Sequence, residues 1–118
     1  MGYTHYWRMS RPFTDESWKS FVKEVKSIFS KTDVPLANGC GEVETKPVFD
    51  HGRMMFNGVE YDSHETCVIT KGMTDFSFCK TARKPYDKVV VKVLKAAQKF
   101  NPGIALTSDG GPEVFENA

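Results

Sequence analysis

Two amphipathic helical patterns, each set between segments with strand character, limit the folds that this chain can adopt. In the first, apolar residues recur at helical spacing from Trp18 to Phe29, and Thr14 precedes them as a predicted N-cap. The second pattern runs from Tyr86 to Phe100. A helix with one apolar face must bury that face, so both helices need a sheet or a second helix to pack on.

Strand patterns precede, separate and follow the two helices. The segment from Tyr3 to Met9 alternates, which places Tyr3, His5 and Trp7 on one face of a strand and the residues between them on the other. We expect a packed His5. Further strands are predicted at 53–56, 65–71, 76–78 and 104–107, with a weaker extended stretch at 43–49. The pair Asn57-Gly58 predicts either a tight hairpin turn or a longer loop that ends at Ser63.

This order of elements predicts the α+β class, with two helices packed on a mostly antiparallel sheet. The order strand, helix, two or three strands, helix, strand is related to the ferredoxin-like plan. A length of 118 residues suits one domain. We therefore expect a single α+β domain over 1–110, followed by a flexible C-terminal tail at 111–118.

Composition narrows the functional classes. The formal net charge of +1 gives no bulk attraction for nucleic acid, so such binding needs a local basic patch. The thiols Cys40, Cys67 and Cys79 have no metal-binding or disulfide spacing, which favours reduced cysteines. No stretch approaches the roughly 20 apolar residues of a membrane span. We expect no membrane partner and a location in the cytoplasm.

The segment that enters the second helix is the most distinctive local feature. It carries cations and a hydroxyl group at Lys80, Thr81, Arg83 and Lys84. Pro85 suits the first helical position, and the free N–H groups of a helix start attract anions. A phosphate, nucleotide or nucleic-acid backbone would fit there, although Asp87 can neutralise the same helix start. The segment is not a P-loop, because its glycine pattern is absent.

His64 is the second candidate, since it lies between Ser63 and Glu65. A histidine beside a hydroxyl and a carboxylate can act as an acid or a base. Neighbours on a strand point to opposite faces, however, so a structural role is favoured. A metal site would require the fold to gather His5, His51 and His64, which have no ligand spacing in sequence. We assign no metal, no cofactor and no catalytic residue.

Several motifs resemble those of small uncharacterised proteins carried by tailed bacteriophages and bacteria. They are Met-Gly-Tyr-Thr-His-Tyr-Trp at 1–7, Phe-Asn-Gly at 56–58, Ser-His-Glu-Thr at 63–66, Phe-Cys-Lys-Thr-Ala-Arg-Lys-Pro-Tyr-Asp at 78–87 and Ser-Asp-Gly at 108–110. The motif at 78–87 is specific, and the others are weak alone. The resemblance implies a phage or prophage origin and action in the cytoplasm of a bacterial host, with no established activity.

The sequence therefore predicts a small phage-type, non-catalytic binding protein that engages a host protein, with inhibition of a host defence system as one form. One alternative is a protein that binds the phosphates of a nucleotide or nucleic acid at the entrance of the second helix. Another is a metal-dependent hydrolase or nuclease. The residues expected to carry binding are Lys80, Thr81, Arg83, Lys84, Tyr86 and His64.

Overall fold

The structure, a computed structural model, describes residues 3–72 and 76–116. Its elements are β1 (Thr4–Met9), α1 (Asp15–Lys31), β2 (Val48–Asp50), β3 (Arg53–Phe56), the 3-10 helix η1 (Glu60–Asp62), β4 (Cys67–Thr70), β5 (Phe76–Lys80), α2 (Asp87–Phe100), β6 (Ile104–Ser108) and α3 (Glu113–Glu116). In this part of the chain, no helix is long and apolar enough to span a membrane.

The strands form two antiparallel sheets, β5-β1-β6 and β2-β3-β4. This confirms the α+β class and the mostly antiparallel pairing. The sheets meet near Glu65 and Lys80, where the Glu65 N–H donates to the Lys80 carbonyl at 3.2 Å and the Lys80 N–H donates to Glu65 Oε1 at 2.9 Å. Within the described residues no ladder joins β4 to β5, so the ferredoxin-like strand order is not confirmed.

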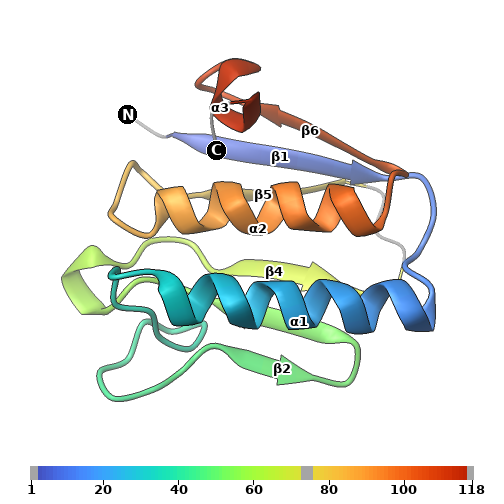
Figure 1. Cartoon of the computed structure of the whole chain (residues 1–118). Helices are drawn as coiled ribbons and strands as arrows, with labels where there is room; N and C mark the ends of the chain where they lie inside the picture. The colour runs from blue at the N-terminus through green and yellow to red at the C-terminus, as the bar shows by residue number, and fades with distance from the viewer. Residues whose placement is uncertain (1–2, 73–75, 117–118) are drawn as a thin grey trace.

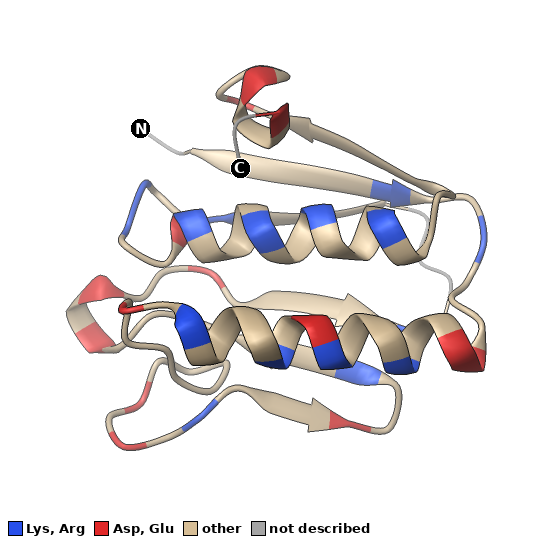
Figure 2. Ribbon diagram, viewed as in Figure 1, with Lys and Arg blue, Asp and Glu red and all other residues tan. Residues whose placement is uncertain are grey.

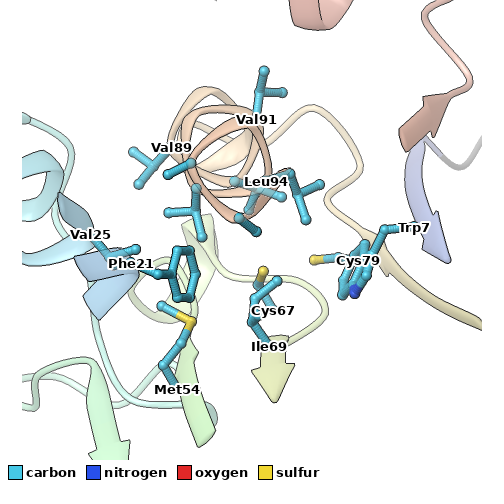
Figure 3. Packing of buried hydrophobic residues seen from close by; sticks show 14 of the residues in the cluster. Trp7, Phe21, Val25, Met54, Cys67, Ile69, Cys79, Val89, Val91 and Leu94 are labelled. Atoms are coloured by element: carbon cyan, nitrogen blue, oxygen red, sulfur yellow. The ribbon is translucent and has the colours of Figure 1, made fainter. Parts of the chain in front are cut away.

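Both long helices lie on one side of the strands, next to each other (Figure 1). The core fills the space between the helices and the sheets. Figure 3 shows Val89 of α2 directed toward Val25 of α1, with Cys67 and Ile69 of β4 near the same helix. The opposite side of β5-β1-β6 has no helix over it in the described part of the chain (Figure 1). That uncovered side is called the open face below.

The helix α1 begins as the sequence predicts. The Thr14 hydroxyl oxygen accepts from the Ser17 N–H at 3.0 Å, and the Ser17 hydroxyl oxygen accepts from the Thr14 N–H at 2.9 Å. This reciprocal capping satisfies two N–H groups that a helix start would otherwise leave unpaired. Phe21 and Val25 are fully buried on the apolar face of the helix.

The pair at 57–58 opens the longer loop rather than a tight hairpin turn. Asn57 is buried, and its side-chain amide donates to the carbonyls of Gly39 at 3.1 Å and His64 at 3.0 Å. Its Oδ1 accepts from the His64 N–H at 3.0 Å. These bonds fix the ends of the loop that contains η1, and they extend across segments too distant for a local turn rule to anticipate.

Two boundaries differ from the sequence expectation. The helix α2 begins at Asp87 with Tyr86 as its N-cap, so Pro85 lies before the first helical position. Residues 113–116 of the expected tail form α3, and Phe115 is buried there. Phe115 packs edge-on against the His5 ring, with centroids 5.9 Å apart, which attaches this segment to the domain. The mobility of the tail stays a prediction.

Candidate functional site

The loop between β5 and α2 is held in place by the first strand. Thr81 is fully buried, and its N–H donates to the Tyr3 carbonyl at 2.9 Å. Ala82 and Arg83 adopt left-handed φ values of 52° and 59°, which cost about 1–2 kcal/mol each for residues other than glycine. The Ala82 N–H to the Tyr3 carbonyl and the Lys84 N–H to the Thr81 carbonyl hold this conformation.

The cations of this loop lie against aromatic rings. The Arg83 guanidinium is 4.0 Å from the centroid of the Tyr3 ring, and the Lys84 ammonium is 4.4 Å from the centroid of the Tyr61 ring. Cations over ring faces are attracted by the ring quadrupole. Arg83 and Lys80 are exposed, so their charges also meet solvent.

The start of α2 is already occupied by a carboxylate of the chain itself. Asp87 Oδ1 is 2.7 Å from His5 Nε2 and accepts a short hydrogen bond from the Thr81 hydroxyl. Burial raises the pKa of Asp87, but the hydrogen bonds of His5 and Thr81 and the charge of Arg83 outweigh this and hold the pKa below its ordinary value. A negative charge here satisfies the positive end of the helix.

A pocket beside this loop does not favour a phosphate either. It has a volume of about 210 Å³, and its lining includes Val34, Val59 and Pro85. The charged group among its lining residues is the carboxylate of Asp62. An anion would be repelled by that carboxylate and would lose its hydration in a largely apolar space.

His5 connects Asp87 to a serine, which forms an array that the sequence analysis missed. His5 Nδ1 is 2.8 Å from Ser108 Oγ, while Nε2 contacts Asp87. The alternation of β1 correctly indicated a packed His5, and a buried histidine requires partners. Those partners lie 82 and 103 positions away in sequence, so no local spacing identifies them.

The Ser108–His5–Asp87 array has the residue types of a hydrolase triad but a different environment. The Ser108 oxygen accepts from the Gly110 N–H at 3.0 Å. His5 is fully buried, with the rings of Tyr3 and Phe115 edge-on at 5.2 and 5.9 Å. A serine nucleophile needs an open position beside its oxygen and N–H donors aimed at the substrate. Here the array connects β1, α2 and β6 as a partly buried polar link.

Tyr86 and His64 occupy opposite environments. Tyr86 is fully buried, and its hydroxyl donates to the Glu65 carbonyl at 2.6 Å. Burial raises the pKa of Tyr86 far above its ordinary value, and the nearby thiols of Cys79 and Cys67 raise this pKa further. His64 is exposed, and its backbone groups are bound by Asn57. Of the predicted binding residues, Thr81 and Tyr86 thus direct their hydroxyl groups into the protein.

Metal and thiol chemistry find little support in the described residues. No group of three or more His, Cys, Asp and Glu side chains lies close enough there to hold a metal ion. Cys67 and Cys79 are buried, and Cys40 is exposed. A hydrogen bond with Cys79, together with burial, raises the pKa of the Cys67 thiol well above its ordinary value, which keeps it protonated and unreactive.

The open face carries a cluster of exposed aromatic side chains. Phe76 and Phe78 are each 50% exposed, and the register of β1 and β5 places Arg8 opposite Phe76 and Tyr6 opposite Phe78. The Tyr6 ring stacks on the Phe76 ring with centroids 6.0 Å apart and planes 25° apart. The Arg8 guanidinium is 5.6 Å from the Phe76 centroid. We call Tyr6, Arg8, Phe76 and Phe78 the open-face patch.

A groove of about 320 Å³ adjoins this patch where β4 and β5 separate. Phe76 and Phe78 form one side of it, and Thr66 and Glu65 contribute polar groups. Lys80 follows Phe78 on the same face of β5, because alternate residues of a strand point to the same side. The open face therefore combines aromatic rings, cations and a polar groove.

The outer side of the helices is different in character. Figure 2 shows lysines repeating along α2 on the side away from the strands. Lys99 pairs with Glu24 of α1 at 3.1 Å, and Lys88 pairs with Asp33 at 3.7 Å. Exposed pairs of this kind contribute little stability, and the surface is polar and solvated. Phe100, at the end of α2, is partly exposed on this side, and the lysines of α2 are its main charged groups.

Comparisons with known protein families, with curated proteins and with solved structures found no match to this chain. The resemblance of the motif at 78–87 to small phage proteins stays a prediction.

Proposed function

We propose that this protein is a non-catalytic binding protein that holds a macromolecular partner on the open face of the β5-β1-β6 sheet. The observation that carries the proposal is the exposure of Phe76 and Phe78, side by side on a face without a covering helix. Burying a phenylalanine side chain is worth about 1.5–3 kcal/mol. Exposed clusters of aromatic residues with polar neighbours mark interaction sites.

The environment of the other candidate groups supports binding over catalysis. His5 is sealed under Tyr3 and Phe115, and the oxygen of Ser108 is engaged by a backbone N–H. The start of α2, which the sequence predicted as a phosphate site, is occupied by the carboxylate of Asp87. The open-face patch, in contrast, presents rings and a cation directly to solvent.

The biological setting of this binding is part of the same proposal. The resemblance of the motif at 78–87 to small phage proteins supports a phage origin and a partner in the cytoplasm of a bacterial host. Inhibition of a host defence system would be one consequence of such binding. These points rest on the motif and not on the open face.

Affinity capture from a bacterial lysate tests the proposed surface. The double variant Phe76→Thr/Phe78→Thr keeps strand propensity while removing both rings. Tyr61→Thr is the matched control, because Tyr61 is 87% exposed but lies on η1. We expect the wild type and Tyr61→Thr to retain the same macromolecule, and the double variant to lose it.

A further variant separates the open face from the basic loop. Arg83→Ala/Lys84→Ala removes the cations of the loop without touching the open-face patch. Loss of capture in this variant, with full capture by Phe76→Thr/Phe78→Thr, would overturn the proposal in favour of the loop. Circular dichroism of each variant checks that the fold is retained.

A further inference from the structure

We propose that the partner of the open face is single-stranded RNA, with bases stacked on the rings of Phe76 and Phe78 and the backbone held by Arg8 and Lys80. This inference rests on the proposed function and assigns the chemical class of its ligand. Its elements are the exposed rings, the placement of the cations and the polar groove beside them.

The rings suit unpaired bases. Phe76 and Phe78 are half exposed on the surface of a sheet, and Tyr6 supports Phe76 from the neighbouring strand. The bases of a duplex are already stacked on one another, whereas unpaired bases can be splayed out onto aromatic side chains displayed by a sheet. A flat face with exposed rings therefore favours a single strand over a duplex.

The cations lie at the two ends of the rings. Arg8 pairs in register with Phe76 at one end, and Lys80 follows Phe78 at the other, about 13 Å along the strand from Phe76. Phosphates that flank the stacked bases would meet these charges. A guanidinium over a ring can also stack on a base itself, and the Arg8 guanidinium already lies over the Phe76 ring. Arg8 and Lys80 are thus the groups of the open face that would contact a polyanion.

Two carboxylates border the open face, and both are hydrogen-bonded. Asp109 accepts from the Thr4 N–H and from the Tyr6 hydroxyl, each at 3.0 Å. Glu65 Oε1 accepts from the Lys80 N–H at 2.9 Å. Such bonds hold each carboxylate in place, but both groups keep their negative charge, so the phosphates would lie beside Arg8 and Lys80 and away from Asp109 and Glu65.

The groove between β4 and β5 is the feature that selects RNA. Glu65 and Thr66 line it next to Phe78. The Thr66 hydroxyl already donates to the Gly39 carbonyl at 2.6 Å, and Glu65 Oε1 accepts from the Lys80 N–H, so both side chains would meet a ribose as hydrogen-bond acceptors. The 2′-hydroxyl is both a donor and an acceptor, and it distinguishes RNA from DNA at a given site. An aromatic surface with a carboxylate-bearing groove therefore favours the ribose form.

Fluorescence anisotropy tests this assignment. The probes are labelled single-stranded homopolymers of A, C, G and U, about ten nucleotides long to match single-domain footprints. Single-stranded DNA of the same sequences and an RNA duplex are the comparison ligands. We expect at least one RNA homopolymer to bind, since base stacking tolerates sequence. The DNA strands and the duplex should bind more weakly.

The variants locate the site. Phe76→Thr/Phe78→Thr should weaken RNA binding by about 30-fold or more, because each stacked base contributes about 1–3 kcal/mol and the variant removes two rings. Arg8→Gln should weaken it less and should flatten the slope of log affinity against log salt by about one phosphate contact. Tyr61→Thr, which alters an exposed ring on η1, should leave the affinity unchanged.

The outcomes separate this inference from the proposed function. The RNA assignment is overturned if no RNA binds or if DNA binds equally well. It is also overturned if RNA binding survives Phe76→Thr/Phe78→Thr. Capture of a protein from nuclease-treated lysate, lost in that same variant, would uphold the proposed function while overturning RNA as the ligand. If Phe76→Thr/Phe78→Thr and Arg8→Gln both retain RNA and every captured macromolecule as the wild type does, the RNA assignment and the proposed function are both overturned.

Discussion

Replacing Asp87 with alanine should destabilise the protein strongly, because its carboxylate is the hydrogen-bonding partner of two buried side chains at the start of α2. Its carboxylate is 23% exposed, contacts His5 Nε2 at 2.7 Å and accepts from the Thr81 hydroxyl. Both of those partners are fully buried. The substitution leaves a ring nitrogen and a hydroxyl in the interior without the acceptor that they share.

The magnitude follows from the groups left behind. Each buried polar group that loses its partner costs about 1–3 kcal/mol. Loss of the negative charge at the helix start adds about 0.3–1 kcal/mol. Water can reach the partly exposed edge of the site and recover some of this loss. We therefore expect a decrease of about 3 kcal/mol in the free energy of unfolding, a large part of the 5–15 kcal/mol typical of a domain.

Urea unfolding monitored by tryptophan fluorescence and by circular dichroism measures this change. Asp15→Ala is the matched control, because Asp15 also begins a helix but is 82% exposed and pairs with Lys71 at the surface. The control should change the unfolding midpoint far less than Asp87→Ala does. If Asp87→Ala unfolds at the same urea concentration as the control, the structural role given to this carboxylate is wrong.

The same carboxylate gives a pH dependence with a definite sign. The folded-state pKa of Asp87 lies below its ordinary value, so the unfolded state binds the proton more tightly. Its contribution to stability is therefore present above the unfolded pKa of about 3.9 and is lost as the pH falls through the folded pKa. The stability difference between the wild type and Asp87→Asn should shrink as the pH falls below about 4.

Three further predictions test the packing. Gly58→Ala would bring a Cβ against the Asp62 carbonyl and should destabilise by about 1–3 kcal/mol. Gly72→Ala should be near neutral, because no atom of the described residues lies within 4 Å of its added Cβ, and thermal unfolding of both variants compares them. Tyr86→Phe removes a buried hydroxyl that donates to a carbonyl at 2.6 Å and should lower the free energy of unfolding by about 1 kcal/mol, and an unchanged urea midpoint would contradict this. A thiol reagent should label Cys40 rapidly in the native protein and the other thiols only in denaturant, so rapid native labelling of a second cysteine would argue against the packing described.

Local patterns predicted the elements of this fold well. The apolar spacing of α1 and the cap at Thr14 lie within a few residues of each other, so sequence alone defines them. The alternation of β1 likewise separated the face of His5 from the face of Tyr6. The sequence did not distinguish a tight hairpin turn from a longer loop after Asn57, because the bonds that hold this loop reach back to Gly39, 18 residues away.

The site was harder to predict, because its residues meet only through strand pairing. Tyr6 and Phe76 are far apart in sequence and stack because β1 pairs with β5. The basic segment drew attention to Lys80, Thr81 and Arg83, but its local pattern could not show that Thr81 turns inward to Asp87. The sequence analysis used Phe76 and Phe78 only to predict a strand and did not assign them to a site. The signal that could have identified them is that these two apolar residues alternate on one face of a short strand whose next residue on that face is a cation, Lys80.

Chemical-shift mapping by nuclear magnetic resonance tests the central claim most directly. Titration of the labelled protein with the tightest single-stranded RNA should shift the amides of Tyr6, Arg8 and the strand Phe76–Lys80 most, with the outer side of α2 unaffected. The opposite pattern, with the largest shifts on α2 or in the loop around Arg83 and small shifts on β1 and β5, would contradict the open face as the binding surface.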